Sequence, residues 1–221
     1  MSHIWDGVTR AVSLTESAAA ERHDLADAGR RYDWHHVLQV LLERPDLVNC
    51  WRPDGRSWFA PLHQVAHGGA SIEVAREVID RGAWRTLRSA NGERPVDIAT
   101  RRGHAHLGNV LAPRIGKEVD RDVLKAIQHQ FHGVIRTRAA DLIDEQALRL
   151  PELEVLLERE PEASEMWFPV PGMYGGFKYR LVTDADGVRL VSESWIRIVG
   201  GSGQLHEITA ERATLVDEGF V

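Results

Sequence analysis

The eleven histidines are the residues of this 221-residue chain that most readily suggest chemistry. His63 and His67 lie four positions apart, so on a helix they would share one face and could hold a metal ion. No Asp, Glu or Cys lies between them to complete a ligand set. His129 and His132 lie three apart, again without a carboxylate on the same helical face within a turn. The sequence therefore predicts no metal and no cofactor.

Nucleophilic and phosphate-binding chemistry finds equally little support. Cys50 is the only cysteine and has no base near it in the sequence. A Gly-x-Ser-x-Gly elbow and a phosphate loop are both missing. The glycine-rich segment Gly172–Gly176 is followed by a predicted strand, so it lacks the helix N-terminus that helps such loops to bind phosphate. We expect no catalytic residue from these motifs.

One aromatic and basic cluster lies in the segment from Asn49 to Phe59. Tryptophan and arginine are enriched at interface hot spots, so a protruding loop of this composition predicts a protein-binding surface. The alternative is that one or two of the aromatic rings fill the space beneath the loop. The residues of this cluster are Trp51, Arg52, Arg56, Trp58 and Phe59.

A second cluster lies near the C-terminal end. Glu193, Trp195 and Arg197 alternate along a predicted strand and therefore share one face of it. With Trp167 and Tyr174 they could line a ligand pocket, in which Glu193 or His206 would act as general acid or base beside Tyr174. The alternative is an ordinary solvent-exposed sheet face with cross-strand charge pairs.

The elements that would position the first cluster follow a repeat of 34 residues. Pro61 and Pro95 lie 34 positions apart, as do Gly69 and Gly103. Proline suits the first turn of a helix, and glycine suits its left-handed end. An apolar stripe follows in each copy and must be covered by a neighbour. Residues 26–49 form a third, more degenerate copy, and residues 83–91 predict an extended hairpin between copies.

These residues resemble the ankyrin repeat, with its Thr-Pro-Leu-His, Gly-His and Gly-Ala hallmarks. The matching segments are Ala60-Pro61-Leu62-His63, Gly103-His104 and Gly82-Ala83. Ala60 and Arg94 replace the threonine, and Asp97 replaces the histidine. The resemblance covers about residues 22–114 and implies three stacked repeats that bind a protein through a concave face and finger tips. To the five residues of the first cluster we add Gln64, His67, Arg85 and Arg88 as expected partner-binding residues.

The second half predicts a different structure. Residues 117–144 carry apolar side chains at helical spacing, so we expect an amphipathic helix that caps the repeats. Residues 151–160 predict one more short helix. From Met166 onward, alternating segments separated by glycine-rich turns predict an antiparallel meander of three to five strands. A meander of this size forms only a marginal core by itself. We therefore expect it to pack on the helix or to pair with a second copy of the chain.

Charge and composition exclude several function classes. Residues 1–115 hold 15 Lys and Arg against 14 Asp and Glu, and residues 116–221 hold 12 against 19. Neither half has the basic excess expected of a nucleic-acid binder. No apolar run approaches the roughly 20 residues that cross a bilayer. The charged N-terminal segment is unlike a signal peptide, which together with the single cysteine predicts a cytoplasmic protein.

The sequence thus predicts the α+β class. We expect an N-terminal extension over residues 1–21, an ankyrin-repeat array over 22–114, a helical bridge or cap over 115–160 and a β module over 161–221. The predicted function is that of a non-enzymatic adaptor that binds a protein partner. The alternative is a small-molecule-binding or catalytic C-terminal module that the repeats position. A homodimer formed through the β module is a further expectation.

Overall fold

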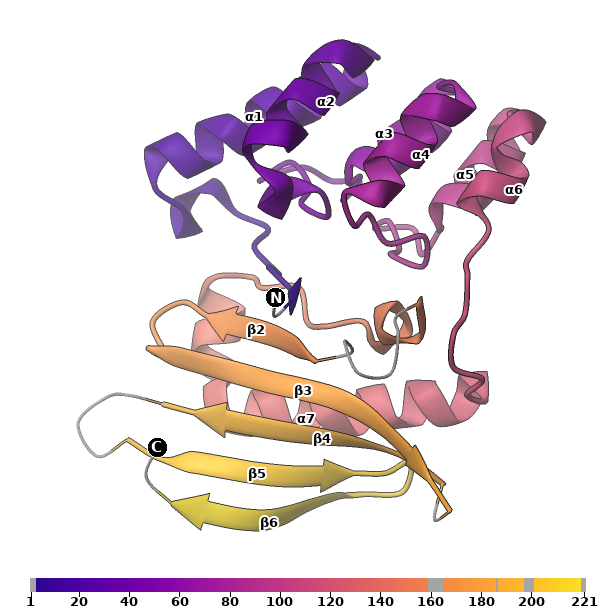
Figure 1. Cartoon of the computed structure of the whole chain (residues 1–221). Coiled ribbons are helices and arrows are strands. Elements are labelled where there is room, and N and C mark those ends of the chain that lie inside the picture. Colours follow the sequence, from indigo (N-terminus) through magenta and orange to yellow (C-terminus); the bar gives the residue numbers. More distant parts are fainter. Residues whose placement is uncertain (1–2, 159–164, 186, 197–200, 220–221) are drawn as a thin grey trace. The chain divides into compact units, whose positions relative to one another are not determined.

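The computed structural model describes residues 3–158, 165–185, 187–196 and 201–219 and divides into two compact units. The helical unit is Thr9–Arg114, and the sheet unit combines Met1–Val8 with Ile115–Val221. Helices build the first, whereas a largely antiparallel sheet and one long helix build the second, so the chain is of the α+β class (Figure 1). No helix in the described ranges is long and apolar enough to span a membrane.

The helical unit stacks helices in two rows. One row brings α1, α3 and α5 together in succession, and the other brings α2, α4 and α6 together (Figure 1). The α-helices are α1 (Glu16–Arg30), α2 (Trp34–Glu43), α3 (Pro61–Gly68), α4 (Ile72–Asp80), α5 (Pro95–Arg102) and α6 (Gly108–Leu111), with short 3-10 turns at η1 (Ala11–Ser13), η2 (Pro45–Leu47) and η3 (Ala105–Leu107).

Local sequence explains where these helices begin and end. The side chains of Thr15, Asp33 and Ser71 cap α1, α2 and α4 by accepting backbone N–H bonds from the first turn. Pro61 and Pro95 occupy the first position of α3 and α5, where the N–H would lack a helical partner. Both helices stop at a glycine in the left-handed region, Gly69 with φ 64° and Gly103 with φ 78°.

The apolar stripes of these helices meet in one continuous core. Leu62, Val78 and Ile98 belong to the same cluster of buried residues and are at most 1% exposed. Burial of each such side chain stabilises the fold by about 1.5–3 kcal/mol. The helices therefore depend on one another for stability, as the 34-residue pattern predicts.

Two loops between the helix pairs are joined to each other. The Asn49 amide donates to the carbonyl of Gly82 and accepts from the amide of Trp84, both at 2.9 Å. The amide of Ala90 donates to the carbonyl of Ser57 at 2.9 Å. Residues 83–91 are described throughout and contain no strand, so the extended hairpin expected there is not formed. Turns and side-chain bonds satisfy its backbone instead.

The sheet unit contains six strands in the order β1 to β6. Strands β2 to β6 form the predicted antiparallel meander, and β1 pairs parallel with β2. The strands are β1 (His3–Ile4), β2 (Met166–Val170), β3 (Gly175–Asp184), β4 (Gly187–Trp195), β5 (Gly203–Ile208) and β6 (Ala213–Gly219).

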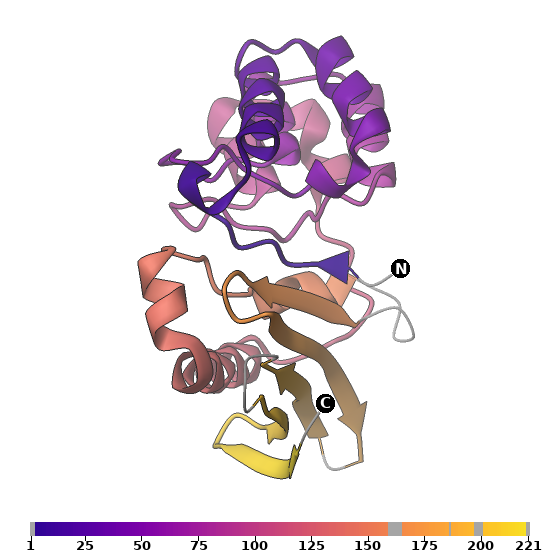
Figure 2. The same ribbon diagram turned by 90° about the vertical axis from the view of Figure 1, so that its left-hand side faces the viewer.

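Helix α7 (Arg121–Glu145) lies along one face of this sheet, as Figures 1 and 2 show. The ring of Phe131 lies 5.0 Å from that of Tyr179 and 6.3 Å from that of Phe177. The predicted packing of the meander on the helix is confirmed. The helix expected to cap the repeats belongs to the sheet unit, and its apolar face packs on the sheet of that unit. The short helix expected near residue 151 appears as a 3-10 segment, η4 (Leu153–Glu158).

The first residues of the chain belong to the sheet unit. The Trp5 indole N–H donates to the carbonyl of Arg149 at 2.8 Å, and the Arg149 guanidinium lies 5.3 Å from the Trp5 ring centre. Trp5 is only 1% exposed. The segment 1–21, expected to be one extension, is therefore divided between the two units.

Candidate functional site

A cleft on the helical unit collects most of the expected partner-binding residues. It has a volume of about 420 Å³ and lies between α1, the loop that precedes α3, and α3 itself. Five of its lining residues were predicted from the sequence: Arg52, Arg56, Phe59, Gln64 and His67. The others are Ala26, Asp27, Arg30, Tyr32, Gly55 and Ser57.

Aromatic rings form one wall of the cleft. Phe59 stacks on His63 with ring centres 5.6 Å apart and contacts His67 at 5.8 Å. The Tyr32 hydroxyl and Nδ1 of His67 form a hydrogen bond of 3.0 Å. Tyr32 takes a left-handed backbone conformation with φ 61°, directly after α1, and its ring packs against Gly68, where a Cβ would lie 2.5 Å from the ring. The rings of Phe59 and Tyr32 are thus held in place by their contacts with α3.

Arginines dominate the charge of the cleft. Arg52 forms an ion pair of 2.5 Å with Asp27, and this hydrogen bond lowers the pKa of the Asp27 carboxyl below its ordinary value. Arg30 and Arg56 are exposed and form no ion pair with any residue that the structure describes. Two positive charges of the cleft therefore lack an internal counter-charge.

His67 lies near two further arginines, Arg101 and Arg102. The pKa of its imidazole is lowered by partial burial and by the nearby charges of Arg102 and Arg101. Arg102 is exposed and donates from Nε to the carbonyl of His67 at 3.4 Å, whereas Arg101 is paired with Glu93. The neutral imidazole is favoured because a further positive charge would be repelled.

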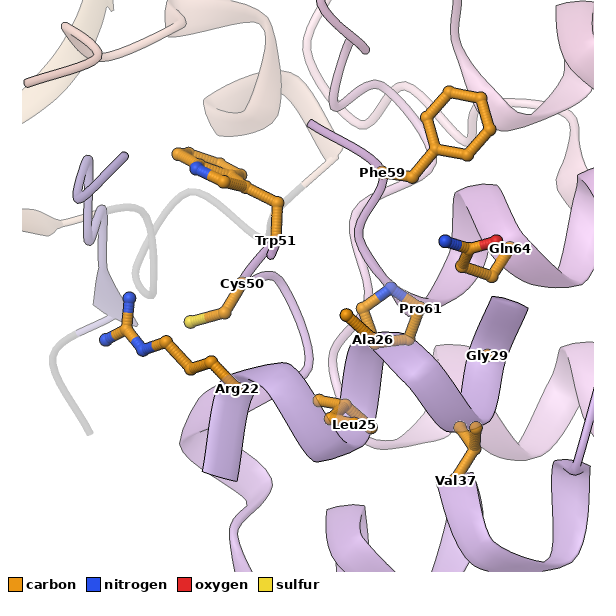
Figure 3. Close-up of a pocket in the computed structure, with 10 residues that line it drawn as sticks. All are labelled: Arg22, Leu25, Ala26, Gly29, Val37, Cys50, Trp51, Phe59, Pro61 and Gln64. Carbon is orange, nitrogen blue, oxygen red and sulfur yellow. The ribbon is translucent and has the colours of Figure 1, made fainter. Parts of the chain in front are cut away.

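Trp51 does not belong to the exposed surface expected of it. It is only 4% exposed and lines a small enclosed cavity of about 10 Å³, room for at most one water molecule. In Figure 3, Trp51, Cys50 and Arg22 lie at one end of this cavity, and Phe59 and Gln64 lie at the other. Trp58 is half-buried, with its ring 6.3 Å from that of Trp51. Trp51 therefore fills the space beneath the loop, the alternative reading of this segment.

Arg85 and Arg88 also lie outside the cleft. Arg85 donates from Nε to the carbonyl of Val110 at 3.0 Å, and Arg88 donates from Nη1 to the carbonyl of Gly92 at 2.7 Å. Both are half-buried. These arginines satisfy backbone acceptors of their own unit, so their expected role at a finger tip is not supported.

The histidines of the repeat segments make structural hydrogen bonds. Nδ1 of His63 accepts from the amide of Ala60 at 3.2 Å, and its Nε2 lies 3.0 Å from the carbonyl of Leu87. His104 and His106 lie within hydrogen-bond distance of the carbonyls of His67 and Ala70. Across the described ranges, no group of three or more His, Cys, Asp or Glu is placed to hold a metal ion.

The residues expected to form a pocket in the sheet unit do not converge. Trp167 and Trp195 stack with ring centres 4.7 Å apart, and Glu193 pairs with Lys178 on that same face. His206 is paired with the buried Ser192 and lines a depression beside α7, on the opposite face.

Of the two remaining members of the expected pocket, the structure describes only Tyr174. Tyr174 is 75% exposed on a turn, and Arg197 lies outside the described residues. Glu193 and His206, each expected as a general acid or base, therefore do not share one pocket, because the register of β4 and β5 places them on different faces of the sheet.

The edge expected to pair with a second copy is β6. All seven of its residues are exposed, and its pairing with β5 shifts register between Leu205 and His206. It also carries Asp217 and Glu218. Bulges and charged residues on an edge strand oppose pairing with another strand. The local geometry therefore does not favour a dimer formed through this edge.

Six lining residues of the cleft were not predicted, and Asp27, Arg30 and Tyr32 are the charged and aromatic ones among them. These three residues lie in the degenerate copy, residues 26–49. Its spacing differs from that of the other two copies, because α1 ends 38 positions before α3 ends, whereas α3 ends 34 positions before α5 ends. The extra residues in the loop before α3 cause the mismatch. The Arg-Arg-Tyr-Asp segment of residues 30–33, at the C-terminal end of α1, is the signal that could have indicated surface residues there.

Comparison with known proteins adds little. No family model and no curated protein matches the chain. One similar solved structure is described as the Bd0816 predatory endopeptidase from Bdellovibrio bacteriovorus in complex with immunity protein Bd3460. The match has a TM-score of 0.33 and 19% identity, and covers 40% of this chain and 43% of that one. A likeness this weak carries no argument about fold or function.

Proposed function

We propose that the helical unit is an ankyrin-type repeat array and that it works as a non-enzymatic protein-binding module. The equivalent positions of Pro61 and Pro95, and of Gly69 and Gly103, support the repeat assignment, because they begin and end helices at the same interval. The shared core of the stacked helices supports it as well.

The departure of Asp97 from the repeat pattern is consistent with this assignment. An Asp97 carboxylate oxygen accepts from the amide of Arg94 at 2.9 Å, just as Nδ1 of His63 accepts from the amide of Ala60. Both side chains satisfy the residue that precedes the helix-starting proline. Asp97 therefore keeps the hydrogen bond to the backbone amide before the proline, and lacks only a second bond like the one that His63 makes to the carbonyl of Leu87.

The single observation that carries the binding function is the cleft. It brings together in one concavity two arginines that form no ion pair with any described residue, two aromatic rings, and the polar side chains of Gln64 and Ser57. Arginine and aromatic residues in a concave site are the features that anchor a bound protein segment. Neighbouring repeats hold this surface in place through backbone and side-chain bonds, so little ordering is required on binding.

Selection from a displayed library of random linear peptides on the full-length protein tests this function. The bound peptides are then mapped by hydrogen exchange. We expect protection in the segments that line the cleft, at the end of α1, in residues 52–59 and in α3. Selected peptides that protect only the sheet unit, or a failure to enrich any peptide, would overturn the proposal. A Gln64→Trp variant, which fills the cleft, should lose the enriched peptides.

A further inference from the structure

The cleft is unusual in the balance of its charges. Its lining contains Arg30, Arg52 and Arg56 against one carboxylate, Asp27, and that carboxylate is already bound by Arg52. Arg102 is exposed beside His67 and adds a further positive charge at the α3 end. A ligand that enters the cleft therefore meets an excess of positive charge beside aromatic rings.

Arginine recognises carboxylates with particular geometry. The guanidinium is planar and can donate two parallel hydrogen bonds to one carboxylate. Arg30 is the last residue of α1, and Arg56 lies in the loop before α3, so the two approach the cleft from different segments. Phe59 offers an apolar surface, and Ser57 and Gln64 offer hydrogen bonds to a peptide backbone.

We propose that this cleft binds an acidic segment of a partner protein, whose carboxylates pair with Arg30 and Arg56 and whose apolar side chain packs on Phe59. The inference rests on the proposed protein-binding function and specifies its partner. The α3 end of the cleft is positive as well, because, after burial, the charges of Arg102 and Arg101 lower the pKa of the His67 imidazole.

A nucleic acid fits the observations less well. The helical unit, residues 9–114, holds 15 arginines against 13 Asp and Glu, so its net charge is only +2. Nucleic-acid binders gain most of their affinity from many phosphate contacts along an extended basic surface. A cleft of about 420 Å³ instead accommodates a few side chains of a peptide.

The charge of peptides selected on the full-length protein tests this specificity. We expect the enriched peptides to carry several Asp or Glu around an apolar residue. An Arg30→Gln/Arg56→Gln double variant should bind them roughly tenfold more weakly, since two charge-assisted contacts are lost. Arg76→Gln is the matched control, because Arg76 is an exposed arginine of α4 outside the cleft, and its affinity should equal that of the wild type.

The possible outcomes separate this inference from the general function. Neutral or basic peptides that protect the cleft would overturn the acidic specificity and leave the protein-binding function standing. Acidic peptides that bind the double variant as tightly as the wild type would also overturn it. Binding of an unrelated single-stranded DNA to the cleft with greater affinity than any peptide would identify a different partner class. An absence of any peptide that protects the cleft would overturn both proposals.

Discussion

Replacement of His63 tests how the stacked helix pairs of the helical unit are held together. The side chain is fully buried and bonds two backbone groups from different segments, the amide of Ala60 and the carbonyl of Leu87. Because Nδ1 accepts a hydrogen bond, the hydrogen of the neutral imidazole is on Nε2, and Nε2 donates to the carbonyl of Leu87. One imidazole therefore joins the start of α3 to the loop between α4 and α5.

His63→Ala would leave both backbone groups buried without this partner. An unsatisfied buried group costs about 1–3 kcal/mol, so the free energy of unfolding of the helical unit should fall by about 2–6 kcal/mol. Loss of the stacked contact with Phe59 adds to this. The loss is a large part of the 5–15 kcal/mol typical of a domain.

Native-state hydrogen exchange is the appropriate assay, because it reports each unit separately. Amides of α3 and of the loop at Leu87 should lose protection in His63→Ala, whereas amides of β3 should not change. His63→Asn should lose less, because its side chain retains an acceptor for Ala60. His35→Ala, at an exposed position of α2, should stay within about 0.5 kcal/mol of the wild type. A loss below about 1 kcal/mol in His63→Ala would refute the reasoning.

Three other perturbations have defined outcomes. Gly69→Ala should lower the free energy of unfolding in urea more than Gly103→Ala does. Both substitutions cost about 1–2 kcal/mol because the backbone is left-handed, but only at Gly69 does the new Cβ lie 2.6 Å from the His104 ring. Equal losses in the two variants would contradict this. Burial lowers the pKa of His132, so the unfolded chain binds more protons near pH 6, and the stability of the sheet unit should fall as the pH drops below about 6.5 and level off above it. His132→Gln should flatten that dependence, and an unchanged slope would be inconsistent with it. Ser194→Ala should leave the urea midpoint unchanged or raise it, because the buried Ser194 hydroxyl has no hydrogen-bond partner among the described residues; a loss of more than about 1 kcal/mol would indicate a partner for this hydroxyl.

Much of the helical unit is predictable because its signals are local and repeated. Pro61 and Gly69 determine the ends of α3 through their own backbone preferences, and the same residue types recur 34 positions later. Trp51 shows the limit of this approach. Composition marks a tryptophan in a loop as a surface anchor, but burial depends on whether a cavity lies beneath it, and that depends on α1.

The sheet unit shows a second limit. Alternation correctly places Glu193 and Trp195 on one face of β4, because that needs only the period of a strand. The face of His206 depends on the register between β4 and β5, which no local pattern determines. Strand β1 has only two residues, too few to show any period.

Titration of the His67 imidazole by NMR tests the central claim most directly. Tyr32, Arg101, Arg102 and His104 surround this ring, and in the free protein its pKa should lie below the ordinary value. An acidic peptide bound in the cleft should raise that pKa, and by linkage its affinity should increase as the pH falls through the range near and below 6.5, in which the imidazole takes up its proton. A pKa that stays the same when the peptide is bound would place the peptide elsewhere and contradict the account.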